Sequence, residues 1–201
     1  EAARKAAGEL VLIFIGPLTN LALALQKYPD LPGLAPRLIL MGGSAAFGNT
    51  TPAAEFNIFF DAESADRVFS AGFDLAMLGL DVTMQASLGR DDLLHLAEIG
   101  GKAGRFLQKS LSISLAWLET LGLDRVAMHD PCTLLYLVYP DMFRAERAGV
   151  RIETKGTLTY GKTVTDLFSD FQYEQQNADV VLEIDHPRFM AVFSEILSRH
   201  Q

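Results

Sequence analysis

The sequence predicts an α/β protein whose mostly parallel sheet is flanked by helices. Nearly continuous apolar runs of strand length occur at 10–16, 37–43 and 75–83. Such runs are typical of parallel strands that helices cover on both faces. Stretches with the period of a helix separate the runs, and this alternation predicts repeated βαβ units. We therefore expect an open, Rossmann-like core in a single α/β domain over 1–201, with a β-hairpin late in the chain.

The helices between the strands carry their own boundary signals. A helical period at 20–28 ends before Pro29, and another at 61–72 starts at an acidic cap and stops at Gly72. The later elements that we expect are helices at 89–99, 102–121 and 131–138, a strand in "VVLEID" and a terminal helix at 187–199.

The composition restricts the kinds of partner. There are 17 Lys and Arg residues against 25 Asp and Glu residues, which argues against a surface for nucleic acid or for an anionic membrane and favours a small molecule. The single cysteine, Cys132, excludes an intrachain disulfide framework and fits a reducing cytoplasm. No apolar run has the length of a membrane span, and the first ten residues lack the order of a signal peptide. We expect a soluble, cytoplasmic protein.

One motif points to a different function. The stretch "GTLTYGKT", residues 156–163, fits the phosphate-loop pattern at every fixed position, which makes a P-loop NTPase one alternative. The flanking sequence alternates about Lys155 and Gly156 as two antiparallel strands joined by a short turn would. Leu158, Thr159 and Tyr160 are also bulky for a compact nest of amides. We therefore favour the hairpin over the phosphate loop.

Polar residues follow the ends of the predicted parallel strands, where α/β proteins bind their ligands. The first strand runs into "GPLTN" at 16–20, and the second into a glycine-rich loop that supplies Asn49, Glu55 and Asn57. An amide, a carboxylate and a second amide together donate to and accept from the hydroxyls of a sugar ring. The alternatives are that Asn49 stabilises a turn and that Glu55 is a solvated helix residue. Because the three residues occur together, we favour a binding site.

A second candidate site lies immediately before the helix predicted at 131–138. His129 and Asp130 precede Pro131, so both fall in the non-helical cap of that helix. Histidine suits proton donation near neutral pH, and a neighbouring carboxylate suits a hard cation. The alternatives are that Asp130 is an N-cap and that His129 is structural.

Three stretches in this order resemble the inosine-uridine preferring nucleoside hydrolases: "IGPLTNLALAL", "ILMGGSAAFGNTTPAAEFNIFFDAESADRVFSAG" and "MHDPCTLLYLVYP". The resemblance extends through most of the chain. The hairpin sequence "GTLTYGKTVTDL" is also similar to a late hairpin of that family, in which an arginine often takes the position of Tyr160. The resemblance implies hydrolysis of the N-glycosidic bond of ribonucleosides, to ribose and a free base for salvage, and it opposes the P-loop NTPase.

The resemblance also implies a role for individual residues. His129 would protonate the departing base, and Trp117 would cover that base. The residues that would hold the ribose are Met41, Asn49, Glu55 and Asn57. The partner would be a small-molecule ribonucleoside, with no nucleic acid and no membrane, and the protein is expected to be a homo-oligomer.

The resemblance implies a calcium ion as well, with Asp130 and the backbone carbonyl of Thr19 among its ligands. The family's Asp-rich D-x-D-x-x-x-D-D motif has no counterpart in "EAARKAAGELVLIF", and the adjacent Asp91 and Asp92 begin a helix far downstream. We therefore expect the chain to be an incomplete, carboxyl-terminal portion of a hydrolase, inactive alone and with weak or no calcium binding. The alternative function is that of a non-catalytic nucleoside- or ribose-binding remnant, or of an interaction module.

Overall fold

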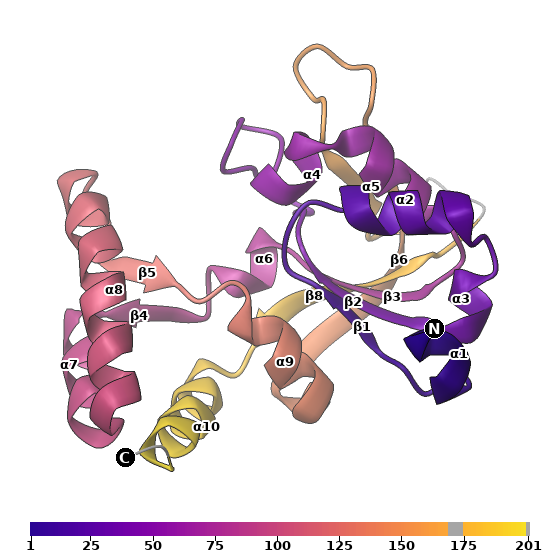
Figure 1. Cartoon of the computed structure of the whole chain (residues 1–201). Coiled ribbons are helices and arrows are strands. Elements are labelled where there is room, and N and C mark those ends of the chain that lie inside the picture. The colour runs from indigo at the N-terminus through magenta and orange to yellow at the C-terminus, as the bar shows by residue number, and fades with distance from the viewer. Residues whose placement is uncertain (169–174, 200–201) are drawn as a thin grey trace. The chain divides into compact units, whose positions relative to one another are not determined.

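The computed structural model describes residues 1–168 and 175–199 (Figure 1). Within it the chain forms two compact units. Unit 1 contains Glu1–Val82 and Asp130–Glu183, and unit 2 contains Thr83–His129 and Ile184–Gln201. The prediction of one domain over 1–201 stays a prediction.

Unit 1 is built around a six-stranded sheet with the strand order β1-β2-β3-β8-β6-β7. β1, β2, β3 and β8 are parallel neighbours, and β7 is antiparallel to β6. The predicted, mostly parallel sheet is therefore confirmed. The bounds of its strands are β1 Leu12–Phe14, β2 Arg37–Met41, β3 Asp74–Leu78, β6 Phe143–Ile152, β7 Thr163–Asp166 and β8 Ala178–Ile184.

Helices cover both faces of this sheet, which is why the central strands are continuous apolar runs. α2 (Thr19–Lys27) and α5 (Ala62–Phe69) pack together over one face, and α9 (Pro131–Val138) packs against β2 on the other (Figure 1). The core between them includes Leu21, Leu25, Leu40, Ile58, Ala65, Val68, Leu75 and Met77. The shorter helices of unit 1 are α1 Ala2–Ala6, α3 Leu31–Leu34, α4 Phe56–Phe60 and the 3₁₀ turn Pro140–Met142. The short helix α6 (Leu80–Thr83) begins in unit 1 and ends at the first residue of unit 2.

We predicted a single strand over the third apolar run, residues 75–83, and this prediction is wrong. β3 ends at Leu78 and α6 begins at Leu80. The chain turns at Gly79 because the loop after β2 crosses there: a Cβ on Gly79 would lie 2.6 Å from the carbonyl oxygen of Gly43. That carbonyl accepts the amide of Leu80 at 2.9 Å. A contact between two loops therefore ends the strand.

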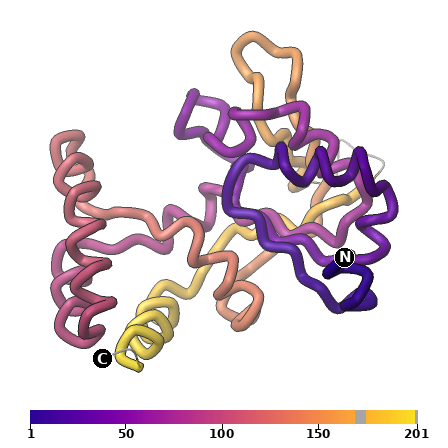
Figure 2. The backbone as a smooth tube through the Cα atoms, in the orientation of Figure 1, coloured from indigo at the N-terminus to yellow at the C-terminus, as the bar shows by residue number. Residues whose placement is uncertain are grey.

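Unit 2 is a helical unit with a small antiparallel sheet. α7 (Arg90–Ile99) and α8 (Gly101–Thr120) run side by side, as Figure 2 shows, and α10 (His186–Ser198) completes the helices. β4 (Ser87–Gly89) pairs with β5 (Arg125–Ala127). These three-residue strands are too short to give an alternating pattern, and the sequence did not predict them. No helix in the ranges 1–168 and 175–199 combines the length and the apolar character that crossing a membrane requires.

The late hairpin is confirmed, but its predicted short turn is wrong. β6 and β7 pair with Ile152 opposite Thr163, so the connection runs from Glu153 to Lys162. The carboxylate of Glu153 accepts the amides of Lys155 and Gly156 at 2.7 and 2.9 Å, which folds the connection back on itself. The P-loop alternative is wrong as well, because a strand begins at Thr163, where a phosphate loop requires a helix.

Gly161 fixes this connection against α4. Its φ is +78°, and a Cβ at this position would lie 2.7 Å from the Cα of Phe59. Gly72 has a similar φ of +86°, but nothing lies within 4 Å of its would-be Cβ. An alanine would therefore suffer backbone strain at both positions, but a steric clash only at Gly161.

We predict that Gly161→Ala destabilises the protein more than Gly72→Ala. The left-handed backbone costs an L-residue roughly 1–2 kcal/mol at either position, and forced repacking against Phe59 adds roughly 1–3 kcal/mol at Gly161 alone. Urea unfolding of both variants measures the difference. Equal midpoints would show that the contact between the connection and α4 has no effect on stability.

Candidate functional site

Glu55 is the centre of the loop that follows β2. Its side chain is only 3% exposed, and its Oε2 accepts the amides of Gly43 at 2.9 Å, Asn57 at 2.9 Å and Ile58 at 3.2 Å. Two of these amides belong to the first turn of α4, so Glu55 is the N-cap of that helix. The alternative of a solvated helix residue is therefore wrong.

The pKa of Glu55 is raised above its ordinary value. Burial is the largest cause, and the charge of Asp130 adds to it, while the three amide bonds act in the opposite direction. Among the described residues, the hydrogen bonds to this carboxylate all end on Oε2. The role of Glu55 as the acceptor of a ligand hydroxyl stays a prediction.

Asn57 bonds to this carboxylate through its backbone amide and to Met41 through its side chain. The side-chain amide of Asn57 donates to the carbonyl of Met41 at 3.1 Å and approaches its Sδ to 3.3 Å. Both residues are buried, at the end of β2 and in α4. The structure thus brings together three of the predicted sugar-binding residues, Met41, Glu55 and Asn57.

Asn49 is exposed, and its side chain stabilises the loop. Its Oδ1 accepts the amide of Phe56 at 3.0 Å and the hydroxyl of Thr50 at 3.4 Å. These bonds agree with the alternative that Asn49 stabilises a turn. Its contact with a sugar stays a prediction.

Thr19 is the first residue of α2, and its hydroxyl donates to the carboxylate of Asp61. Asp61 also accepts the amide of Ser64 at 3.0 Å, as the N-cap of α5. Burial raises the pKa of Asp61, but the bonds from Thr19 and Ser64 outweigh it and leave this pKa below its ordinary value. The side chain of Thr19 therefore links the N-termini of α2 and α5. The role of its backbone carbonyl as a metal ligand stays a prediction.

Asp130 lies at the start of α9 and is exposed, with no hydrogen bond from its side chain to the amides of that helix. Its backbone carbonyl instead accepts the hydroxyl of Thr133 at 2.7 Å. Asp130 therefore occupies the N-cap position of α9, as the alternative expected, but its carboxylate accepts no amide of that helix. In the part of the chain that the structure describes, no group of three His, Cys, Asp or Glu residues is placed to hold a metal.

His129 belongs to unit 2 and lines a cavity of about 530 Å³ there. Its Nδ1 lies 2.8 Å from the hydroxyl of Thr83, a fully buried residue that fixes the rotation of the ring. The walls are mostly apolar. The cavity's other lining residues are Met84, Ser87, Leu111, Ser114, Leu118, Leu123, Asp124, Arg125, Val126 and Ala127.

Trp117 lies on α8 but does not line this cavity. It is 63% exposed. The predicted contact of Trp117 with a base therefore stays a prediction without support from the cavity.

Residues that the sequence did not single out as functional also reach the loop after β2. Asp81 accepts the amides of Ala45 at 2.7 Å and Ala46 at 3.1 Å. Lys162 and Thr163 bond to the same loop from the hairpin. The sequence feature that could have identified Asp81 is its position at the end of the third apolar run, in "GLDVT". Lys162 and Thr163 belong to the phosphate-loop pattern, which does not indicate a contact with this loop.

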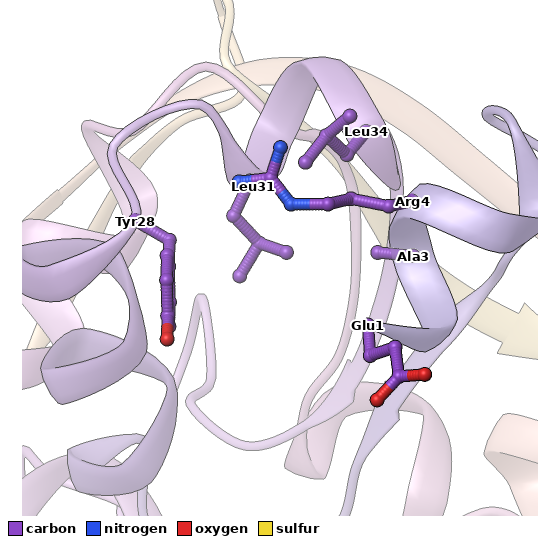
Figure 3. A pocket seen from close by; sticks show the side chains of 6 residues that line it. All are labelled: Glu1, Ala3, Arg4, Tyr28, Leu31 and Leu34. Carbon is purple, nitrogen blue, oxygen red and sulfur yellow. The ribbon is translucent and has the colours of Figure 1, made fainter.

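A separate cavity of about 280 Å³ in unit 1 contains none of the predicted residues (Figure 3). Arg4 in its wall is already paired with Asp30 at 3.2 Å. The cavity is lined by Glu1, Ala3, Arg4, Tyr28, Leu31 and Leu34. The candidate functional site therefore remains the loop after β2.

Curated relatives match nearly the whole chain. The pyrimidine-specific ribonucleoside hydrolase RihA of Shewanella woodyi is 39% identical over 193 residues, which are 95% of this chain and 62% of that protein. The RihA of Salmonella enteritidis is 36% identical over 196 residues, or 96% of this chain and 63% of that protein. The chain thus spans less than two thirds of the length of these relatives.

Solved structures show the same fold. A plant nucleoside hydrolase has a TM-score of 0.90 at 27% identity, over 98% of this chain and 64% of its own. A purine-preferring ribonucleoside hydrolase from Gardnerella vaginalis has a TM-score of 0.89 at 29% identity, over 99% and 63%. The family model described as inosine-uridine preferring nucleoside hydrolase matches residues 1–191. With this match and the identity to its curated relatives, the chain belongs to the family of inosine-uridine preferring nucleoside hydrolases.

Proposed function

We propose that the protein hydrolyses the N-glycosidic bond of ribonucleosides and that this chain supplies its ribose-binding loop. The observation that carries the proposal is the buried carboxylate of Glu55, which accepts the amides of Gly43 and Asn57 through Oε2, while the side chain of Asn57 bonds to Met41 at the carboxyl end of β2. A carboxylate held by three backbone amides is preorganised, so it would move little when a ligand binds. Oε1 would accept a ribose hydroxyl.

The chemistry of the reaction favours such a group. Breaking an N-glycosidic bond builds positive charge on the ribose in an oxocarbenium-like transition state. A fixed carboxylate beside the ring stabilises this charge, and it does so more strongly in a site from which water is excluded. Asn57 and Met41 would fix the orientation of the sugar.

His129 is proposed to protonate the departing base. The bond between its Nδ1 and Thr83 orients the imidazole, and a positioned histidine can protonate a departing base. We confine the proposed substrate to ribonucleosides in general, because the named relatives differ in their base: RihA is called pyrimidine-specific and the Gardnerella enzyme purine-preferring.

The described residues do not form a calcium site by themselves. Calcium takes 6–8 oxygen ligands, whereas the family resemblance implies only Asp130 and the Thr19 carbonyl in this chain. No acidic cluster accompanies them within 1–168 and 175–199. We propose that these two residues are part of a larger ligand set in the complete protein. When bound, calcium would orient and activate the attacking water. The cytoplasmic location and the homo-oligomer stay predictions.

The second candidate function is a non-catalytic nucleoside- or ribose-binding protein. The same geometry of Glu55 and Asn57 favours it, since both residues would grip a sugar whether or not the bond is broken. Turnover separates the two functions, because a binding protein would retain ribose affinity and release no base.

We predict that Glu55→Gln lowers kcat/KM for ribonucleosides by roughly 100-fold or more, in the protein expressed from its complete reading frame. Glutamine keeps the size and an acceptor oxygen but removes the negative charge that stabilises the transition state. Steady-state release of base measures the effect. Glu9→Gln, an exposed residue of the same unit, is the matched control, and wild-type turnover in Glu55→Gln would contradict the role of the carboxylate.

A further prediction concerns the leaving group. His129→Ala should lower kcat for inosine by roughly 100-fold, the magnitude that general-acid catalysis contributes, and should lower kcat for uridine less, because the two bases leave with different proton demands. His95→Ala provides the control, since His95 is an exposed histidine of α7. Equal losses for inosine and uridine would exclude His129 as the acid.

For calcium, we predict that the 201-residue chain binds the ion with a Kd weaker than about 1 mM and releases no appreciable base from inosine or uridine. One carboxylate and one carbonyl leave most of the coordination to water. Isothermal calorimetry and a base-release assay of the purified chain measure both quantities. Micromolar binding together with robust turnover would show that unrecognised residues of this chain complete the site.

A further inference from the structure

The loop after β2 is held by side chains that are distant in the sequence. The loop segment Ser44–Ala46 has no strand or helix of its own, yet Ser44 is almost fully buried. Buried backbone groups need hydrogen-bond partners. In this segment the hairpin and α6 supply them.

Lys162 makes the contact that is least expected. Its ammonium group donates to the carbonyls of Ser44 at 3.0 Å and Ala45 at 3.1 Å. The side chain is half-buried, and this burial lowers the pKa of Lys162, while the charge of Asp81 acts in the opposite direction. A lysine that is partly withdrawn from water requires such acceptors.

Two further side chains complete the arrangement. The hydroxyl of Thr163 accepts the amide of Ser44 at 2.8 Å and donates to its carbonyl at 2.6 Å. Asp81 accepts the amides of Ala45 and Ala46 and the hydroxyl of Ser44, the last at 3.2 Å. The amides of Ser44, Ala45 and Ala46 and the carbonyls of Ser44 and Ala45 are therefore all bonded to side chains.

The segment begins directly after Gly43, which bonds to the carboxylate of Glu55. The amide of Gly43 donates to Oε2 of Glu55, and the carbonyl of Gly43 accepts the amide of Leu80. Gly43 precedes Ser44 directly. The position of the segment therefore sets the position of one of the three donors that fix Glu55.

We propose that Lys162 is a positioning residue which, with Thr163 and Asp81, clamps the segment Ser44–Ala46 so that Glu55 is fixed for ribose binding. This inference rests on the proposed function. The clamp gives a role to the sequence Lys-Thr, which lies where the connection of the hairpin ends and β7 begins. The role is specific to a donor of more than one hydrogen bond, which Arg supplies and Met does not.

The test compares Lys162→Met with Lys162→Arg and with Lys155→Met. Lys155 is an exposed lysine of the same connection and serves as the matched control. Amide hydrogen exchange of the 201-residue chain should accelerate about tenfold or more at 44–46 in Lys162→Met, the loss expected for charge-assisted hydrogen bonds. The amides of β2 should exchange as in the wild type, and Lys162→Arg should restore most of the protection.

The second measurement uses the protein expressed from its complete reading frame. Lys162→Met should raise KM for uridine and Kd for ribose about tenfold and change kcat much less. A purely structural role would instead lower the melting temperature without raising KM and Kd more than it changes kcat. Unchanged exchange at 44–46 would overturn the clamp. Faster exchange with an unchanged KM and Kd would overturn its role in sugar binding. A wild-type protein that neither binds ribose nor releases base would overturn the proposed function, and the inference with it.

Discussion

The burial of the Glu55 carboxylate is the constraint on which the site depends. A carboxylate withdrawn from water is tolerated only when hydrogen-bond donors replace the water. Three backbone amides do so here, and they come from both ends of the loop: Gly43 at its start, Asn57 and Ile58 beyond its end. The carboxylate therefore closes the loop into a ring, caps α4 and aligns Asn57 with Met41. Each of these features depends on the acceptor oxygen of Glu55 staying in place.

The parallel sheet determines where this ring lies. Because β1, β2 and β3 are parallel, the segments that follow them leave from one edge of the sheet, and they contain Thr19, Glu55 and Asp81. The hairpin then adds Lys162 and Thr163, which lie more than a hundred residues after Glu55 in the sequence. A polar site of this kind needs rigid support, and support from several elements fixes it better than the loop alone.

The stretch "GTLTYGKT" shows how a motif acquires its meaning from its context. In a phosphate loop the Lys and Ser/Thr of this pattern face a nucleotide, because the chain enters a helix directly after them. Here the chain enters β7, and the same two residue types bond to the backbone of a neighbouring loop. The donors and acceptors are the same, but a strand directs them toward protein instead of a ligand.

The sequence by itself determined the parallel core, the order of its helices and the family, because apolar runs, caps and the register of Asn49, Glu55 and Asn57 are local patterns. Tertiary structure alone decided that Glu55 is a buried cap, that β3 stops at Gly79 and that Lys162 clamps a loop more than a hundred residues away. The physical reason is that these features depend on contacts between segments far apart in the chain. Burial, close approach and the choice of hydrogen-bond partner are set only when those segments meet.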